Sequence, residues 1–256
     1  MIVLLEFVYR LSFGLALAMA VTPPRLVTSG YYRNNSYVLL GLGALAAGVS
    51  WIHREPLPLW PALAAAALSY LSVVWWLDDQ GPLGIITLLL VAIASLNGAW
   101  FVSGASLKQL PQGLDLGTQM IGWLDPLTGG LVLGVTMAAM LLGHWYLNAP
   151  GMKLAPLQRL VLVLAGSLVI RAIVCGVGLT IWMGLATPPA QIDWLFLTLR
   201  WLAGLVGVAA TAWMTWQTLK IPNTQSATGI LYVAVILSFI GELTGQLLSK
   251  RVGLPL

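Results

Sequence analysis

Long uninterrupted apolar stretches dominate this sequence, and they restrict the folds that are available to it. Each stretch runs for about 20 residues, the length that a helix needs to cross the hydrocarbon core of a bilayer. Only helices and closed barrels satisfy their backbone hydrogen bonds in hydrocarbon, and barrel strands are short with alternating polarity. The chain is 59% hydrophobic and 8% charged, whereas soluble domains are about 25% charged. The sequence therefore predicts an all-α transmembrane helical bundle.

Proline, glycine and charged residues separate the apolar stretches and give the span boundaries. We expect about eight spans in a single integral-membrane domain, residues 1–256, at approximately 2–22, 36–53, 59–77, 83–104, 127–148, 157–186, 192–218 and 227–248. Residues 105–126 form the longest expected loop, with room for a short interfacial helix.

Five ionisable residues fall inside the expected spans and are the strongest functional signal in the sequence: Glu6, Arg10, Arg171, Arg200 and Glu242. A charge at the centre of a membrane helix costs at least about 2.5 kcal/mol unless it is paired or hydrated. Glu6 and Arg10 are one helical turn apart and can pair along the helix. Arg200 can pair with Glu242 on the next span.

Arg171 has no evident carboxylate partner among the expected spans. A buried guanidinium suits a carboxylate, a lipid phosphate or a quinone carbonyl. Two roles are therefore open for the five residues. They form a satisfied network that holds spans one, six, seven and eight together, or they form a ligand site or proton route. The second role predicts a quinone or structural lipid around Arg171, Arg200 and Glu242.

The two histidines and the single cysteine predict no metal or haem site built from this chain's own ligands. His53 and His144 fall at opposite ends of the expected bundle, and the chain has no CxxC or HExxH motif. We expect no covalently bound cofactor. His144, Tyr146 and Asn148, at the end of the fifth span, are expected to be interfacial polar residues. Haem ligation by His144 with a nearby methionine is the alternative.

Eight spans can also be read as two sets of four. Pro24 precedes Arg33 by nine residues, and Pro150 precedes Arg159 by the same interval, in both cases near the mouth of the second helix of a set. Because four spans preserve orientation, such a duplication would be a parallel 4+4 repeat. It would differ from the inverted repeats of many secondary transporters.

An even number of spans places both ends of the chain on one side of the membrane, which we call the terminal side. Lysine and arginine in the expected loops number four on this side and five on the other, so the positive-inside rule does not decide the orientation. We expect a multi-pass protein of the inner, cytoplasmic membrane with a periplasmic terminal side. The formal net charge of +4 fits basic cytoplasmic loops and requires no nucleic-acid partner.

One segment carries a resemblance. Ser226–Gly245, SATGILYVAVILSFIGELTG, is similar to the closing helices of membrane anchor subunits of molybdenum-enzyme respiratory complexes. The resemblance covers one span, and it implies a membrane subunit with protein partners in an electron-transfer assembly.

Three functional classes follow. The first is a non-catalytic integral membrane subunit or anchor of a larger electron-transfer complex, with the lipid bilayer and other membrane or peripheral subunits as its partners. The alternative is a small-solute or proton-coupled transporter, for which the intramembrane charges would form the pathway. The third is an intramembrane enzyme acting on lipid-linked substrates, which has the least support because no catalytic motif is present.

Overall fold

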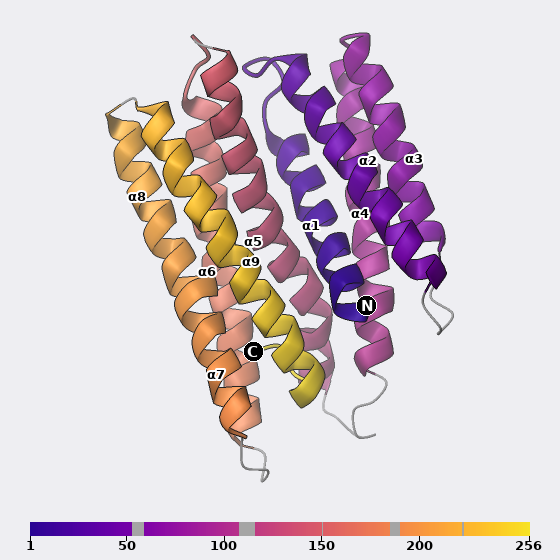
Figure 1. Ribbon diagram of the computed structural model, residues 1–256, viewed down its shortest axis with the longest axis vertical. Coiled ribbons are helices and arrows are strands. Elements are labelled where there is room, and N and C mark those ends of the chain that lie inside the picture. Colours follow the sequence, from indigo (N-terminus) through magenta and orange to yellow (C-terminus); the bar gives the residue numbers. More distant parts are fainter. Residues whose placement is uncertain (53–58, 108–115, 150, 185–189, 222) are drawn as a thin grey trace.

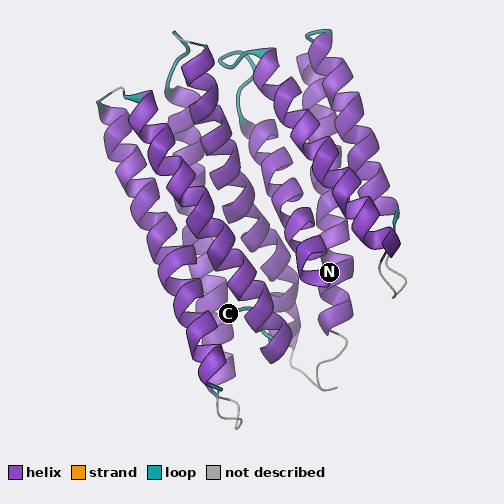
Figure 2. Cartoon of the chain, in the orientation of Figure 1, coloured by secondary structure: helices purple, strands orange, loops and turns teal. Residues whose placement is uncertain are grey.

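The computed structural model describes residues 1–52, 59–107, 116–149, 151–184, 190–221 and 223–256. In these parts of the chain, helices are joined by short loops and no strand is found (Figure 2). Eight helical stretches of the described residues are long and apolar enough to cross a membrane. The predicted all-α bundle is therefore confirmed.

The seventh span consists of three consecutive helical segments, and each of the other spans is one helix. The elements are α1 (Ile2–Val21), α2 (Ser29–Ile52), α3 (Trp60–Leu77), α4 (Gly81–Leu107), α5 (Leu116–Asn148), α6 (Ala155–Met183), α7 (Gln191–Leu199), the π-helix η1 (Arg200–Gly207), α8 (Val208–Lys220) and α9 (Thr224–Val252).

Two helices begin well before the predicted boundary. The helix α2 begins at Ser29 rather than at residue 36, because its polar first turns bury side chains against a neighbour: the Ser36 hydroxyl lies 3.0 Å from that of Ser72. The helix α5 begins at Leu116 rather than at residue 127. The expected loop 105–126 is therefore wrong at both ends, and residues 108–115 lie outside the described part of the chain.

The spans pack as two sets of four, and each set is a closed ring in chain order. In the first set α1 contacts α2 and α4, and α3 completes the ring. In the second set α5 contacts α6 and α9, and the seventh span lies between those two. The sets meet where α1 packs against α5, near the middle of the bundle (Figure 1). A duplication in the sequence itself stays a prediction.

Glycines allow α1 and α5 to approach at backbone distance. A Cβ atom added at Gly14 would lie 1.8 Å from the carbonyl oxygen of Gly130, and one added at Gly134 would lie 1.9 Å from the carbonyl carbon of Gly14. Small residues permit such close helix packing in membranes, where lipid provides no hydrophobic driving force. The junction between the two sets is therefore a backbone-to-backbone contact.

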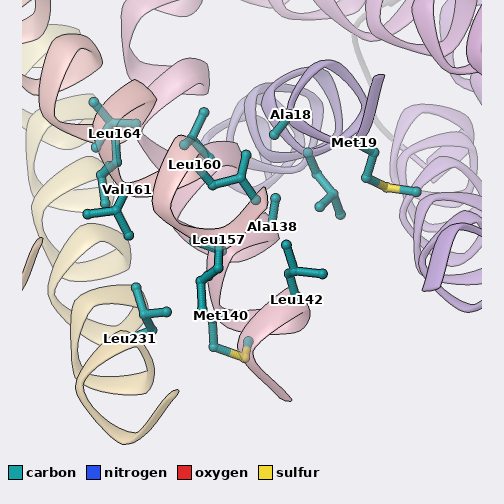
Figure 3. Packing of buried hydrophobic residues seen from close by; sticks show 14 of the residues in the cluster. Ala18, Met19, Ala138, Met140, Leu142, Leu157, Leu160, Val161, Leu164 and Leu231 are labelled. Carbon is teal, nitrogen blue, oxygen red and sulfur yellow. The ribbon is translucent and has the colours of Figure 1, made fainter. Parts of the chain in front are cut away.

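A continuous apolar cluster fills the half of the bundle away from the terminal side. Figure 3 shows part of it, where residues from four different helices converge, including Met19 of α1, Ala138 of α5, Leu160 of α6 and Leu231 of α9. These side chains are at most 1% exposed. This core thus joins the two sets on the side of the charged residues that faces away from the terminal side.

Residues 253–256 turn back into the bundle after α9. Gly253 has a φ of 80° and reverses the chain, which a glycine does without steric cost. Leu254 and Leu256 then pack with Trp182 and other apolar residues at the terminal-side end of the second set. The carbonyl of Pro255 lies so close to Gly178 that a Cβ there would be 1.8 Å from its oxygen.

Candidate functional site: a buried ion-pair network

The helix α1 contributes the first two charged residues. Glu6 and Arg10, one turn apart, form an ion pair along the helix. Arg10 also pairs with Asp125 of α5, and its Nη1 donates to Glu242 Oε1 of α9 at 2.5 Å. The Arg10 residue is 1% exposed. One guanidinium of the first set therefore binds two carboxylates of the second set.

Asp125 is the carboxylate partner of Arg171, which the sequence alone did not reveal. Arg171 Nη1 donates to Asp125 Oδ1 at 2.6 Å and to Thr128 Oγ1 at 3.0 Å. Its Nη2 lies 3.4 Å from Glu242 Oε2. The expectation of an Arg171 without a carboxylate partner is therefore wrong. The reason is that α5 begins earlier than expected and carries Asp125 into the bundle.

Glu242 connects three arginines. Besides Arg10 and Arg171, it faces Arg200, whose Nη1 lies 3.7 Å from Glu242 Oε2. Gly129 leaves space for this carboxylate, because a Cβ at that position would lie 2.5 Å from Glu242 Oε1. The sequence prediction that Arg200 faces Glu242 agrees with this geometry, although the separation is the longest in the network.

Arg200 stands at the start of the π-helix η1 and has two further partners. Its Nε donates to the backbone oxygen of Leu256 at 3.2 Å, and its Nη2 contacts Cys175 Sγ at 3.4 Å. Close packing of Gly204 on Gly241 brings η1 against α9 at this level. π-Helical turns often occur at functional sites, and here the turn coincides with a buried cation.

The network reaches the terminal-side surface through Lys250. Its Nζ lies 3.2 Å from Glu6 Oε2, and its side chain is 19% exposed. Ser103 of α4 donates to Glu6 Oε1 at 2.8 Å. Three carboxylates and four cations are thus held together, and every one of the three carboxylates has more than one partner.

The structure brings all five predicted intramembrane residues into this one network, and it adds Asp125 and Lys250. Sequence reasoning missed Asp125 because Pro126, which usually ends or kinks a helix, follows it directly. Here Pro126 lies inside α5. The excess of arginine over acidic residues within the spans could have indicated Asp125, because a buried Arg171 requires a carboxylate partner.

The three predicted interfacial residues do not join the network and lie at the opposite end of the bundle. His144 is exposed, and its Nδ1 lies 3.3 Å from the Tyr232 hydroxyl. Tyr146 is buried instead, and its hydroxyl donates to the carbonyl of Lys153 at 2.5 Å. Asn148 is the exposed last residue of α5. His53 lies outside the described residues.

In the part of the chain that the structure describes, no three histidine, cysteine or acidic side chains are grouped to hold a metal ion. What the network can do is fix helices relative to one another, since buried ion pairs resist separation in a low-dielectric interior. Comparison with protein families, with curated proteins and with solved structures finds no match.

Proposed function

We propose that this protein is a non-catalytic integral membrane subunit that serves as a rigid anchor in a larger membrane complex. The observation that carries the proposal is the position of the network. Arg10 of the first set binds Asp125 and Glu242 of the second set. The ion pairs therefore cross the junction between the two sets of helices.

Ion pairs that link the two sets of helices favour an anchor over a transporter. Alternating access requires one set of helices to rock against the other around a central site. Opening this bundle on the terminal side would pull Arg10 away from two buried carboxylates, and leaving a buried charge unpaired costs about 3–5 kcal/mol. The glycine contact between α1 and α5 would have to open as well. The geometry supports two sets that move as one body.

One further observation is compatible with membership of an electron-transfer complex, and a second one supports it. Large apolar side chains are exposed on the outer face, for example Leu162, Ile173 and Val233, and such a surface is covered by lipid or by helices of partner subunits. The resemblance of Ser226–Gly245 to the closing helices of respiratory anchor subunits supports a redox assembly. A quinone or lipid around Arg171, Arg200 and Glu242 stays a prediction, and it would compete there with existing ion pairs.

Mild purification from native membranes tests the proposal directly. We expect the protein to elute with other subunits, including haem-containing or iron–sulfur proteins identified by absorption spectroscopy and mass spectrometry. A lone monomer or homodimer whose thermal stability rises with one small solute would instead indicate the transporter.

A distance measurement separates the two classes without knowledge of the partners. Spin labels are placed at the exposed Ile52 of the first set and the exposed Gln191 of the second, in a Cys175→Ser background. An anchor gives one narrow distance distribution in detergent and in vesicles, with or without a proton gradient. Two populations that exchange with conditions would overturn the rigid-anchor proposal.

A further inference from the structure

A lateral groove runs between α6 and the η1–α8 segment, separate from the ion-pair network. Its volume is about 560 Å³, and its walls include Val161, Ala165 and Ala172 on α6 and Trp201, Ala209 and Trp216 on the facing segment. Leu162, Val169 and Trp213 at its edges are 56%, 61% and 64% exposed. The groove therefore opens sideways into the hydrocarbon of the bilayer.

The groove is long and narrow. Its lining on α6 extends from Val161 to Ala172, which is about 16 Å along the helix at 1.5 Å per residue. The volume over this length gives a section of about 30–35 Å², and hydrocarbon carbons pack roughly 4 Å apart. The groove is therefore wide enough for at least one extended hydrocarbon chain.

Basic residues stand at one end of the groove. The helix α6 begins, and α8 ends, at the surface opposite the terminal side (Figure 1). Lys220 lies one turn beyond Trp216, on the same side of α8. Gln158 lies one turn before Leu162, with Arg159 next to it. Lys220 and Arg159 are exposed, and neither forms an ion pair with any residue that the structure describes.

We infer that this groove is a binding site for an anionic phospholipid. The phosphate group lies at Lys220 and Arg159, and an acyl chain fills the groove toward Ala172 and Trp201. Basic pockets between membrane helices bind anionic headgroups in this way. The charge at the mouth and the apolar walls below it match the two parts of such a lipid. The site is independent of the anchor function.

A quinone fits the groove less well than a phospholipid. Its carbonyl oxygens need donors beside the ring, whereas the lining side chains are aliphatic except for Trp201, Trp213 and Trp216, whose indole nitrogens are their one kind of polar atom. The unpaired cations stand at the mouth, at headgroup level. The observations therefore favour recognition of an anionic headgroup.

Native mass spectrometry of the full chain in mild detergent tests the site. Phosphatidylglycerol and phosphatidylcholine with identical acyl chains are added in turn. We expect one phosphatidylglycerol to be retained, and its retention to fall at least roughly tenfold in the double variant Lys220→Gln with Arg159→Gln, since each basic residue near the surface attracts anionic lipid. Arg25→Gln, at an exposed cation on the same surface, should leave retention unchanged.

A second pair of variants tests the groove itself. Ala209→Phe fills it and should abolish retention, whereas Ala210→Phe, at an exposed neighbour outside the lining, should not. Ala165→Phe fills the opposite wall and replaces Ala209→Phe if that variant does not fold. Equal retention of phosphatidylcholine, or full retention by both groove-filling variants, overturns the proposal. So does a quinone that is displaced by Ala209→Phe but not by the charge variants.

Discussion

Arg10 is a single residue whose side chain contacts three carboxylates from three helices. Arg10 matters because it balances charge. If it were removed, the three carboxylates of Glu6, Asp125 and Glu242 would share fewer cations in a medium that solvates none of them. Asp125 has the corresponding position among the acids, because it binds Arg10 and Arg171 at once. A loss at either residue therefore affects several partners.

Substitution of Asp125 tests this dependence. In Asp125→Asn the side chain keeps its size but loses its charge, so Arg10 and Arg171 become under-compensated. We expect the free energy of unfolding in mixed micelles to fall by about 3–5 kcal/mol, as for other broken buried pairs. Asp78→Asn is the control, because Asp78 is exposed in the loop after α3 and should change stability by less than about 0.5 kcal/mol. Equal stability of both variants would contradict the central role of Asp125.

Individual charges were thus easier to find than their partners. The five residues Glu6, Arg10, Arg171, Arg200 and Glu242 are evident from the sequence because a charge within an apolar stretch is conspicuous. Their three-dimensional pairing depends on which helices are neighbours and on depth within the bilayer, and neither is encoded locally. Asp125 has in addition a local reason to be read as a loop residue, because Pro126 follows it directly.

The pairing of α1 with α5 is the decisive contact at the level of elements. Gly14 on one helix meets Gly130 and Gly134 on the other, and the same two helices carry Arg10 and Asp125. The ion pairs can form because the backbones are so close. Any side chain at the crossing would move the charges apart as well as the helices.

Gly14→Ala should therefore destabilise far more than one methyl group suggests. The added Cβ meets a backbone oxygen that cannot rotate away, so α1 and α5 must separate. We expect a loss of at least about 1–3 kcal/mol, the usual range for overpacking, in chemical unfolding followed by tryptophan fluorescence. Gly41→Ala on α2 is the matched control, because a Cβ at Gly41 meets nothing within 4 Å. Similar midpoints for both variants would show that the crossing is not tight.

The packing of the returning segment 253–256 can be tested by substituting two glycines of α6. Gly178→Val collides with the carbonyl of Pro255, whereas Gly176→Val, two residues earlier on α6, has open space. We expect hydrogen exchange at the amides of Gly253, Leu254 and Leu256 to accelerate in Gly178→Val only, because the packing of this segment on Trp182 and the contact of Leu256 with Arg200 are lost. Protection that is unchanged in Gly178→Val would disprove this packing.

Most spans could be predicted at the level of elements, but not all of their ends. The apolar stretches give the number of spans because hydrocarbon imposes a minimum length. The predicted start of α2 is seven residues late, because a helix can continue beyond the hydrocarbon, where hydropathy no longer marks it. The sequence does not predict the π-helix η1 either, which packs closely on α9 where Gly204 meets Gly241.

The distribution of unpaired charge over the whole molecule bears on its orientation. On the terminal side, Lys250 is paired with Glu6 and Arg251 with Asp193. On the opposite side, exposed basic residues lack ion pairs within the described chain: Arg25, Lys153, Arg159 and Lys220. The positive-inside rule counts lysine and arginine near span ends and gives carboxylates little weight, and Arg54 and Lys108 of the terminal side lie outside the described residues. The periplasmic terminal side therefore stays a prediction.

Single cysteines test this orientation in a Cys175→Ser background. A membrane-impermeant maleimide should label Gln191→Cys, on the terminal side, in intact cells. It should label Asp78→Cys, on the opposite side, only after the membranes are opened. Both positions are exposed, so accessibility within the protein is matched. The reverse labelling pattern would show that the terminal side faces the cytoplasm.

Biosynthesis must accommodate the long separation of the paired charges. Arg10 and Glu242 are 232 residues apart in the chain, so at 5–20 residues per second the ribosome needs about 12–46 s between them. Until Asp125 is made, about halfway through that interval, the first span has Glu6 as the sole partner of its arginine. A chain that stops before that point would leave Arg10 without its partners from α5 and α9, and membrane proteases could recognise such an unfinished molecule.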